Sequence, residues 1–308
     1  MAFDMDMDMD MDMDMDMATG KGGSGRMTAV PPELGLRPLT LDFTPQATPH
    51  PNFPTDPVPK ELWLWDDKLW DGGLLALLEL RQFAANAGAA PAWQTIILPS
   101  PVLQWDPTGN AAGYEAFVRS EITLLVAFMQ TERERYMAEI VAQAENAVNY
   151  WFALLGITQK SKPNTVLLLQ MAGRIGELVA MFYKNKFKRV RPSVVCPGLQ
   201  PPFGPPGHPS FPSSHALQSR LFSLCLEEVT RRPRPGGTSP YQIQLDWLAE
   251  RVAINRERAG VHYPSDSQGG QLISDSLFPL LNVEPTSGLP KDRSMFKATL
   301  EAAAGEWS

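Results

Sequence analysis

The 308-residue sequence has two cysteines, little of the alternation typical of β-strands and no long apolar run without charge. Cys196 and Cys225 are too few for the disulfide framework that stabilises small secreted domains. The apolar stretch Thr165–Tyr183 is interrupted by Arg174 and Glu177, whereas a spanning helix needs about 20 mostly apolar residues. We therefore expect a protein of a reducing compartment without a membrane span.

Outside the first 26 residues, positive and negative side chains nearly balance. The formal net charge is −7, and residues 1–26 carry −5 of it, which leaves about −2 for the rest. Such a balance argues against a nucleic-acid surface. Met alternates with Asp from Met5 to Met17, without the basic and apolar regions of an export signal. We expect a disordered acidic tail, with metal capture by its carboxylates as the alternative, and a cytoplasmic location.

Composition divides the chain into three parts. Residues 1–30 are the Met-Asp tail and a Gly/Ser linker, and residues 31–60 are rich in proline and are expected to be extended. Apolar residues at helical spacings begin after them, and a hydrophobic share of 44% is enough for a core. We expect one all-α domain, a helical bundle, over residues 61–304.

The periodicity and the prolines also predict where the helices lie. Pro163 suits the first turn of a helix that reaches about Phe187. Residues 192–212 hold eight prolines, which lack the backbone donor of helices and central strands, so this segment is predicted to be a loop. The expected helices are about 74–86, 114–155, 163–187, 213–230, 241–258, 264–281 and 291–304.

Three short segments carry residue types that suit an oxyanion. In the first, Lys184 and Arg191 are seven positions apart, which is two helical turns, so both lie on nearly one face. An ammonium and a planar guanidinium there could grip one anion together. The alternative is a solvated basic helix end, since cations are favourable at any helix C-terminus.

The second segment ends the proline-rich loop and opens a helix with Ser213, Ser214 and His215. Backbone N–H groups at a helix N-terminus suit an oxyanion, and a histidine held there is a candidate general acid or base. The alternative is an ordinary helix start, in which Ser213 is the N-cap and His215 is structural.

The third segment contains Arg256, His262 and Asp266. His262 and Asp266 are four positions apart, so the carboxylate can hold one imidazole nitrogen and leave the other as nucleophile or ligand. Arg256 adds a third cation. The alternative is a chance pairing of histidine and aspartate.

In order and spacing, the segments resemble the superfamily that joins type-2 phosphatidic acid phosphatases, bacterial class A acid phosphatases and vanadium haloperoxidases. Its pattern is K-x6-R-P, then P-S-G-H, then S-R-x5-H-x3-D, and the match covers 83 residues from Lys184 to Asp266. Ser214 stands where glycine is usual, and Asn255 stands where serine is usual. The resemblance implies a helical bundle of the acid phosphatase and vanadium haloperoxidase type.

The resemblance also implies which residues bind the anion. Lys184, Arg191 and Arg256 would neutralise a phosphate or vanadate. Ser213 and the backbone N–H of Ser214 would complete the cradle.

The remaining matching residues would carry the chemistry. His262 would attack phosphorus or coordinate vanadium, with Asp266 orienting it. His215 would protonate the leaving group or assist peroxide activation. The superfamily needs no divalent metal for phosphate hydrolysis, so the implied cofactor is vanadate for a haloperoxidase and none for a phosphatase.

Residues around the cradle bear on the choice between the two chemistries. His208 lies seven positions before His215, where vanadium bromoperoxidases carry a second histidine that would tune halide chemistry. The alternative is a loop histidine without a role. Met181 favours the phosphatase, because many haloperoxidases carry tryptophan three positions before the lysine. The lack of a span and of an export signal disfavours lipid phosphatases and exported acid phosphatases.

We therefore expect a vanadium-dependent haloperoxidase-type enzyme that oxidises bromide or iodide with hydrogen peroxide at a vanadate bound to His262. The first alternative is a metal-independent phosphomonoesterase that works through phosphorylated His262. The second is a non-catalytic oxyanion-binding protein, which has no need of both His215 and His262. The expected partners are small molecules, and a homo-oligomer is compatible with the sequence.

Overall fold

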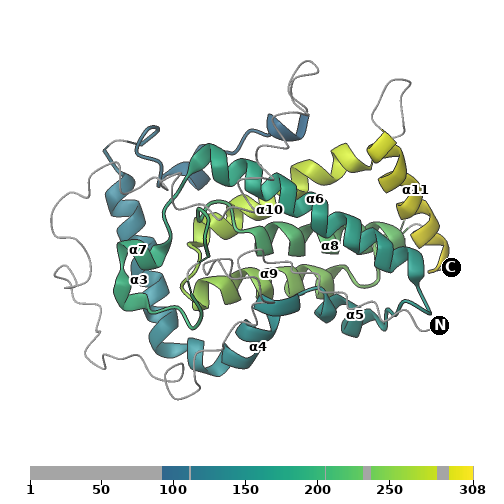
Figure 1. Cartoon of the computed structure of the whole chain (residues 1–308), viewed down its shortest axis with the longest axis horizontal. Coiled ribbons are helices and arrows are strands. Elements are labelled where there is room, and N and C mark those ends of the chain that lie inside the picture. The colour runs from purple at the N-terminus through teal and green to yellow at the C-terminus, as the bar shows by residue number, and fades with distance from the viewer. Residues whose placement is uncertain (1–91, 111, 205, 232–236, 283–290, 308) are drawn as a thin grey trace, which may run out of the picture.

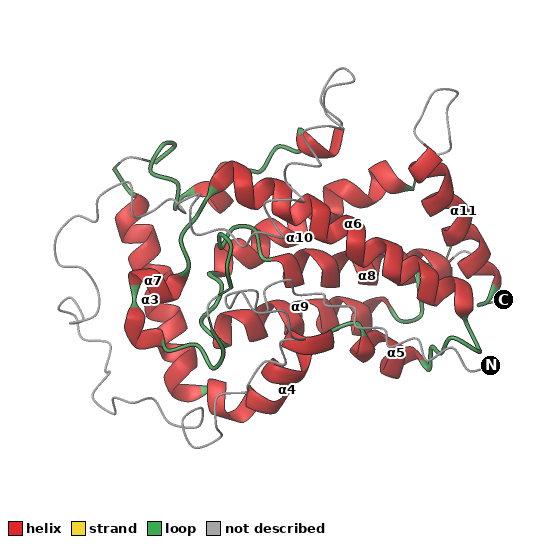
Figure 2. Cartoon of the chain, viewed as in Figure 1, coloured by secondary structure: helices red, strands yellow, loops and turns green. Residues whose placement is uncertain are grey.

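The computed structural model describes residues 92–110, 112–204, 206–231, 237–282 and 291–307. The expected acidic tail, the proline-rich segment and the helix expected at about 74–86 lie outside these residues. Within the described residues every regular element is a helix, which confirms the all-α class (Figure 2).

The helices expected from Pro163 onwards agree with the structure to within one residue at each end. The α-helices are α3 (Tyr114–Thr131), α4 (Arg133–Asn146), α5 (Asn149–Leu155), α6 (Pro163–Phe187), α7 (Pro192–Val195), α8 (Ser214–Arg231), α9 (Gln242–Arg258), α10 (Pro264–Leu281) and α11 (Lys291–Gly305). The short 3₁₀ helices are η3 (Ala92–Gln94), η4 (Ser100–Leu103) and η5 (Pro197–Leu199).

The single helix expected at 114–155 is wrong, because the chain bends and forms α3, α4 and α5 there. α3 ends at Thr131, and Glu132 leaves the helical conformation with φ −125° and ψ −35°. Arg133 is buried after this bend, and its Nη1 donates to Leu199 O at 2.7 Å. Apolar spacing continues across the bend, so periodicity alone cannot locate it.

The segment 192–212 is not wholly a loop, because it contains α7 and η5. Both short helices begin with a proline, Pro192 and Pro197. Proline is tolerated at a first helical position, where its missing N–H would have no helical partner. The rest of the segment returns to the start of α8.

α8 is central among the described helices and packs against α6, α9 and α10 (Figure 1). Its buried residues lie on nearly all of its sides, and they include Leu217, Leu221, Phe222 and Leu226. A helix that is buried nearly all round belongs to a core rather than to a surface. The N-terminus of α8, which carries the second oxyanion segment, is therefore held inside the protein.

α10 approaches the start of α8 very closely at Gly270. A Cβ atom there would lie 2.6 Å from the carbonyl oxygen of Ser213 and 2.9 Å from the nitrogen of Leu217. The backbone N–H of Ser213 donates to the carbonyl of Asp266 at 3.0 Å across the same contact. The glycine therefore lets the second and third segments pack backbone against backbone.

By length and composition, α6 alone among the described helices could cross a membrane, with a mean hydropathy of 1.4 in its most apolar window. Of that window, 61% is buried inside the protein, and α8 and α11 pack against the helix. A mostly buried apolar helix is typical of a core, so α6 is weak evidence for a span.

Candidate functional site

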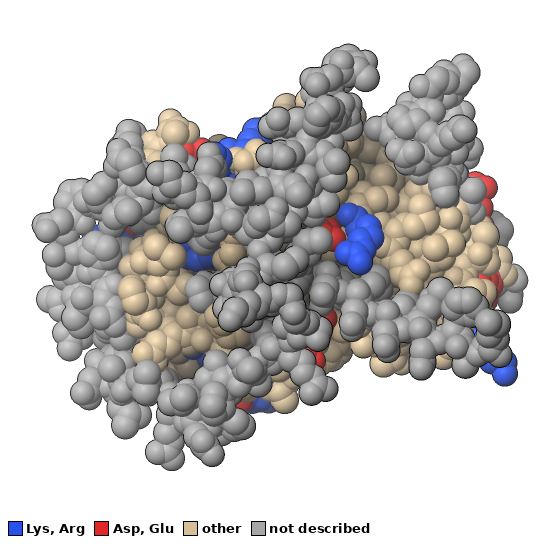
Figure 3. Space-filling model, in the orientation of Figure 1, with Lys and Arg blue, Asp and Glu red and all other residues tan. Residues whose placement is uncertain are grey.

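The ammonium of Lys184 holds the loop that precedes α8. Lys184 lies in the last turn of α6, and its Nζ donates to the carbonyl oxygens of Pro209 at 2.9 Å and Ser210 at 3.2 Å. Lys184 and Arg191 do not form a solvated helix end, because both are fully buried. On the face shown in Figure 3, the visible Lys and Arg form small separate groups. Lys184 and Arg191 have no exposed surface.

The guanidinium of Arg191 joins this loop to the connection between α9 and α10. Its Nε donates to His208 O at 3.0 Å, and its Nη1 donates to Val261 O at 2.9 Å. Nη1 also lies 3.0 Å from His262 Nε2, and Nη2 lies 3.1 Å from His208 Nδ1. One cation is thus in contact with two buried imidazoles.

The hydrogen-bond partners of His262 define its tautomer. A guanidinium only donates, so the Nε2 that faces Arg191 carries the lone pair. The other ring nitrogen, Nδ1, lies 3.3 Å from Asp266 Oδ2 and carries the proton. The sequence predicts that Asp266, four positions after His262, holds one nitrogen of its ring, and the structure has this contact.

The two buried histidines beside Arg191 are neutral. Burial, followed by the charge of Arg191, lowers the pKa of His262 well below its ordinary value. Burial and the charges of Lys184 and Arg191 lower the pKa of His208 in the same direction. A neutral imidazole with an unprotonated Nε2 is the form that can act as a nucleophile or a ligand.

Asp266 lies in the first turn of α10, and both of its carboxylate oxygens are bonded. Oδ1 accepts from Arg189 Nη1 at 2.6 Å, and Oδ2 accepts from Ser210 Oγ at 2.5 Å and from the N–H of Tyr263 at 3.0 Å. Burial opposes ionisation, but Arg189, His262 and Ser210 together hold the pKa of Asp266 well below its usual range. The carboxylate is therefore charged and fixed in orientation.

Three residues of this network were not predicted from the sequence, namely Arg189, Ser210 and Glu121. Arg189 stands only two positions before Arg191, so its place in the first segment was a usable signal. Glu121 lies in α3, about 145 positions before Asp266, and its carboxylate bonds Arg189 at 2.6 Å. No local pattern marks such a distant partner.

His215 and Arg256 both hydrogen-bond to backbone carbonyls of α4. His215 Nε2 lies 3.2 Å from the carbonyl oxygen of Gln143, and Arg256 Nη2 donates to the carbonyl oxygen of Ile140. Because a carbonyl only accepts, Nε2 of His215 carries a proton. Val261 N donates to Arg256 O at 3.2 Å, which links this group to the residue before His262.

The two serines at the start of α8 differ in their contacts. Ser213 is an N-cap, since its Oγ accepts from the N–H of Ala216 at 3.3 Å. Ser214, which replaces the usual glycine, is 3% exposed. Within the described part of the chain, its Oγ has no hydrogen-bond partner. The added side chain is therefore accommodated without a bond of its own.

Asn255, which stands where the superfamily usually has serine, makes two side-chain hydrogen bonds. Its Nδ2 donates to Gln143 Oε1 at 2.9 Å, and its Oδ1 accepts from Arg258 Nη1 at 2.9 Å. Gln143 is also the residue whose carbonyl bonds His215. The longer side chain of asparagine thus ties α9 to the part of α4 that supports His215.

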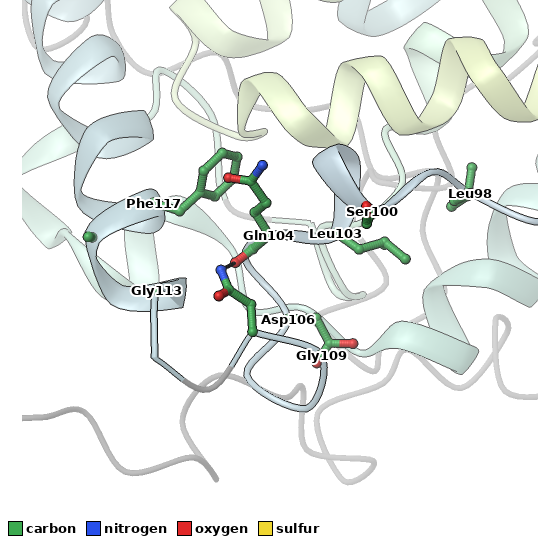
Figure 4. A pocket seen from close by; sticks show the side chains of 10 residues that line it. Leu98, Ser100, Leu103, Gln104, Asp106, Gly109, Gly113 and Phe117 are labelled. Atoms are coloured by element: carbon green, nitrogen blue, oxygen red, sulfur yellow. Dashed lines mark hydrogen bonds between the residues drawn. The ribbon is translucent and has the colours of Figure 1, made fainter.

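A hollow of about 770 Å³ lies where η4 meets the start of α3. Its lining includes Leu103, Gln104, Asp106 and Phe117 (Figure 4). None of the residues predicted for the oxyanion site lines it. The hollow is therefore a surface feature separate from that site.

No protein-family model matches the chain. The chain is 29% identical over 119 residues to a decaprenylphosphoryl-5-phosphoribose phosphatase of Mycolicibacterium smegmatis, covering 38% of this chain and 59% of that protein. It is 27% identical over 95 residues to a vanadium-dependent bromoperoxidase of Ascophyllum nodosum, covering 24% of this chain and 17% of that protein. The chain thus spans less than two thirds of either relative.

Both relatives are enzymes, one a phosphatase and the other a haloperoxidase. They are consistent with the superfamily that the three segments resemble, and they confirm that resemblance at a distance. They also agree with an enzyme that is either a phosphohydrolase or a haloperoxidase.

Proposed function

We propose that the chain is a vanadium-dependent haloperoxidase-type enzyme in which His262 holds vanadate. The observation that carries this proposal is the pair of imidazoles on one buried guanidinium. His262 Nε2 and His208 Nδ1 lie 3.0 and 3.1 Å from nitrogens of Arg191. The similarity to a vanadium-dependent bromoperoxidase supports the same reading.

The residues present fit vanadate as a cofactor. The unprotonated Nε2 of His262 is a nitrogen ligand, and Arg191 offers a forked donor for oxygen atoms beside it. Lys184, Arg256 and the start of α8 would complete the charge and the donors. Bound vanadate would supply the Lewis-acid activation of peroxide.

The protein's own residues would then deliver the proton and influence the halide step. Reduction of hydrogen peroxide to water, with oxidation of bromide to hypobromous acid, consumes one proton. His215 donates from Nε2 to Gln143, so this proton would pass through its Nδ1. His208, which is buried and neutral against Arg191, would tune the halide step without adding charge.

The second candidate is a metal-independent phosphohydrolase. It is favoured by the similarity to a phosphatase, which covers more of the chain than the bromoperoxidase match. His262 Nε2 would attack phosphorus while the bond to the ester oxygen breaks, and His215 would protonate the leaving alcohol. Water would then cleave the N–P bond and return its proton to His215.

The test uses the full chain, purified with and without orthovanadate. Peroxide-dependent bromination and p-nitrophenyl phosphate hydrolysis are measured on each sample. The proposal expects bromination only with vanadate, and a loss of about 10³-fold or more in His262→Ala. Hydrolysis that vanadate inhibits, without bromination, would replace it by the second candidate.

Two further variants sharpen this test. His50→Ala changes a histidine outside the three segments, so both activities should match the unmodified chain. His208→Ala should change bromide turnover more than vanadate affinity. A His208→Ala protein with unchanged turnover would remove the proposed role of His208.

A further inference from the structure

A further fully buried arginine, Arg189, lies behind the candidate site. It follows the end of α6, where Lys188 adopts a left-handed conformation with φ 51° and turns the chain out of the helix. Its side chain is 2% exposed. Arg191 reaches His262, the second residue before α10, while Arg189 reaches the first turn of α10 itself.

The guanidinium of Arg189 lies between two buried carboxylates. Its Nη1 donates to Asp266 Oδ1 at 2.6 Å, and its Nη2 donates to Glu121 Oε2 at 2.6 Å. Ser265 closes the arrangement, since its Oγ accepts from Arg189 Nη1 at 2.7 Å and its N–H donates to Glu121 Oε1 at 2.8 Å. Without this cation, two buried carboxylates would share the space unpaired, which is strongly unfavourable.

Two aromatic rings hold the guanidinium in this place. The Arg189 carbon Cζ lies 3.6 Å from the ring centroid of Tyr263 and 4.6 Å from that of Trp105. An arginine that is bonded at its edge and covered by rings has one orientation. Arg189 therefore presents a fixed donor to Asp266.

The fixed donor contributes to how Asp266 meets His262. Oδ1 of Asp266 is bonded to Arg189, which leaves Oδ2 toward His262 Nδ1 at 3.3 Å. Because Arg189 holds Oδ1 while Ser210 and the N–H of Tyr263 hold Oδ2, the carboxylate cannot rotate away from the imidazole. Outer contacts of this kind orient a reacting histidine and fix its tautomer.

We propose that Arg189 is a positioning residue for the His262–Asp266 pair, with Glu121 as its counter-carboxylate. It acts through Asp266 by helping to hold the proton of His262 on Nδ1, the tautomer that the donor of Arg191 facing Nε2 also favours. The inference rests on the proposed function only in taking His262 as the reacting residue, and it applies to vanadate binding and to attack on phosphorus alike.

The first test reads the tautomer directly. The full chain is labelled with ¹⁵N-histidine, and long-range ¹⁵N–¹H correlations are recorded, with the His262 signals identified by their absence in His262→Ala. We expect the Nδ1–H form in the unmodified chain and a larger share of the Nε2–H form in Arg189→Met, limited by the donor of Arg191 that still faces Nε2. The control is Arg220→Met, which also removes an arginine that bridges carboxylates, those of Asp246 and Asp275.

The second test measures turnover in the same proteins. Arg189→Met should lower kcat about 10- to 100-fold while changing KM little, as expected when a residue that orients a ligand is lost. Arg189→Lys keeps one charge and one donor and should recover part of this loss. Arg220→Met should retain both the Nδ1–H form and kcat.

The outcomes separate this inference from the proposed function. The tautomer is recorded without substrate or vanadate, so it decides the role of Arg189 even if neither activity is found. If Arg189→Met does not fold, the His262 tautomer is measured in Arg189→Lys and Glu121→Gln instead. We expect a partial shift toward the Nε2–H form in both. A folded Arg189 variant that keeps the Nδ1–H form and an unchanged kcat would overturn the inference.

Discussion

Arg191 Nη1 and His262 Nε2 lie 3.0 Å apart inside the protein, with no exposed surface on either residue. The nitrogen that would bind vanadium or attack phosphorus therefore faces a forked cation. An oxyanion bonded to this nitrogen would place its oxygen atoms among the donors of Arg191. We therefore propose that anion affinity depends most directly on Arg191.

The first prediction concerns Arg191→Lys, which keeps the charge but loses the planar fork. Hydrogen bonds to charged groups contribute roughly 1.5–3 kcal/mol each, so orthovanadate should bind about 10- to 100-fold more weakly. Isothermal titration with orthovanadate measures this change. Arg220→Lys is the control and should bind like the unmodified chain, whereas equal affinity in both variants would contradict the prediction.

The second prediction concerns the role of Asn255. Asn255→Ala removes the bonds to Gln143 and Arg258 and leaves both buried partners short of one bond. The free energy of unfolding, measured with urea, should fall by about 1–3 kcal/mol. Gln271→Ala, which removes a surface bond to Glu250, should change it by less than about 0.5 kcal/mol. A similar effect of the two substitutions would refute the structural role of Asn255.

The third prediction tests the contact of α10 with α8. Gly270→Ala forces the two helix starts apart, because its Cβ would lie 2.6 Å from the Ser213 carbonyl oxygen. We expect a loss of about 1–3 kcal/mol in the free energy of unfolding, together with weaker orthovanadate binding. Gly109→Ala, whose Cβ meets nothing within 4 Å, is the matched control. An unaffected Gly270→Ala protein would show that the close packing is dispensable.

The fourth prediction concerns pH. Burial, together with nearby carboxylates, raises the pKa of Glu257 from 4.5 to about 7. A carboxyl whose pKa is raised by folding stabilises the native state fully below pH 4.5, and this contribution is lost as pH rises through about 7. The loss is roughly 3 kcal/mol, at 1.36 kcal/mol per pKa unit.

Glu257→Gln removes this titration and isolates its effect. Urea unfolding at pH 5, 6, 7 and 8 should show the unmodified chain losing stability relative to Glu257→Gln as pH rises. The difference is largest above pH 7, where the buried carboxylate must be charged. Parallel pH curves for the two proteins would mean that Glu257 titrates normally.

The helices from Pro163 onwards could be predicted because proline, serine and loop residues mark their starts. The bend at Glu132 could not, since the apolar spacing of α3 runs on into α4 and the bend is stabilised by Arg133, which bonds Leu199 in η5. Tertiary contacts of this kind have no local signature. The same reason hides the short helices inside the proline-rich segment, where two prolines start helices instead of preventing them.

The candidate site shows a similar division. The spacing of four positions predicts Asp266 against one nitrogen of His262, and the structure has this contact. The contact of Arg191 with the other nitrogen was not predicted and is seen only in the structure. The motif says nothing of Glu121, whose carboxylate comes from α3 and meets Arg189 only in the folded chain. Candidate anion-binding residues can thus be predicted from a pattern, whereas the residues that hold them in place are found from the fold.

Burial of the cations also determines how the protein should respond to ionic strength. Mobile ions screen exposed charges within a Debye length of about 8 Å at physiological salt, but they screen buried pairs much less. Lys184, Arg191 and Arg256 are each 1% exposed or less. Affinity for an anion already in place should therefore vary little with added sodium chloride. An enzyme of this kind would bind an oxyanion with similar affinity at high and at low sodium chloride concentration.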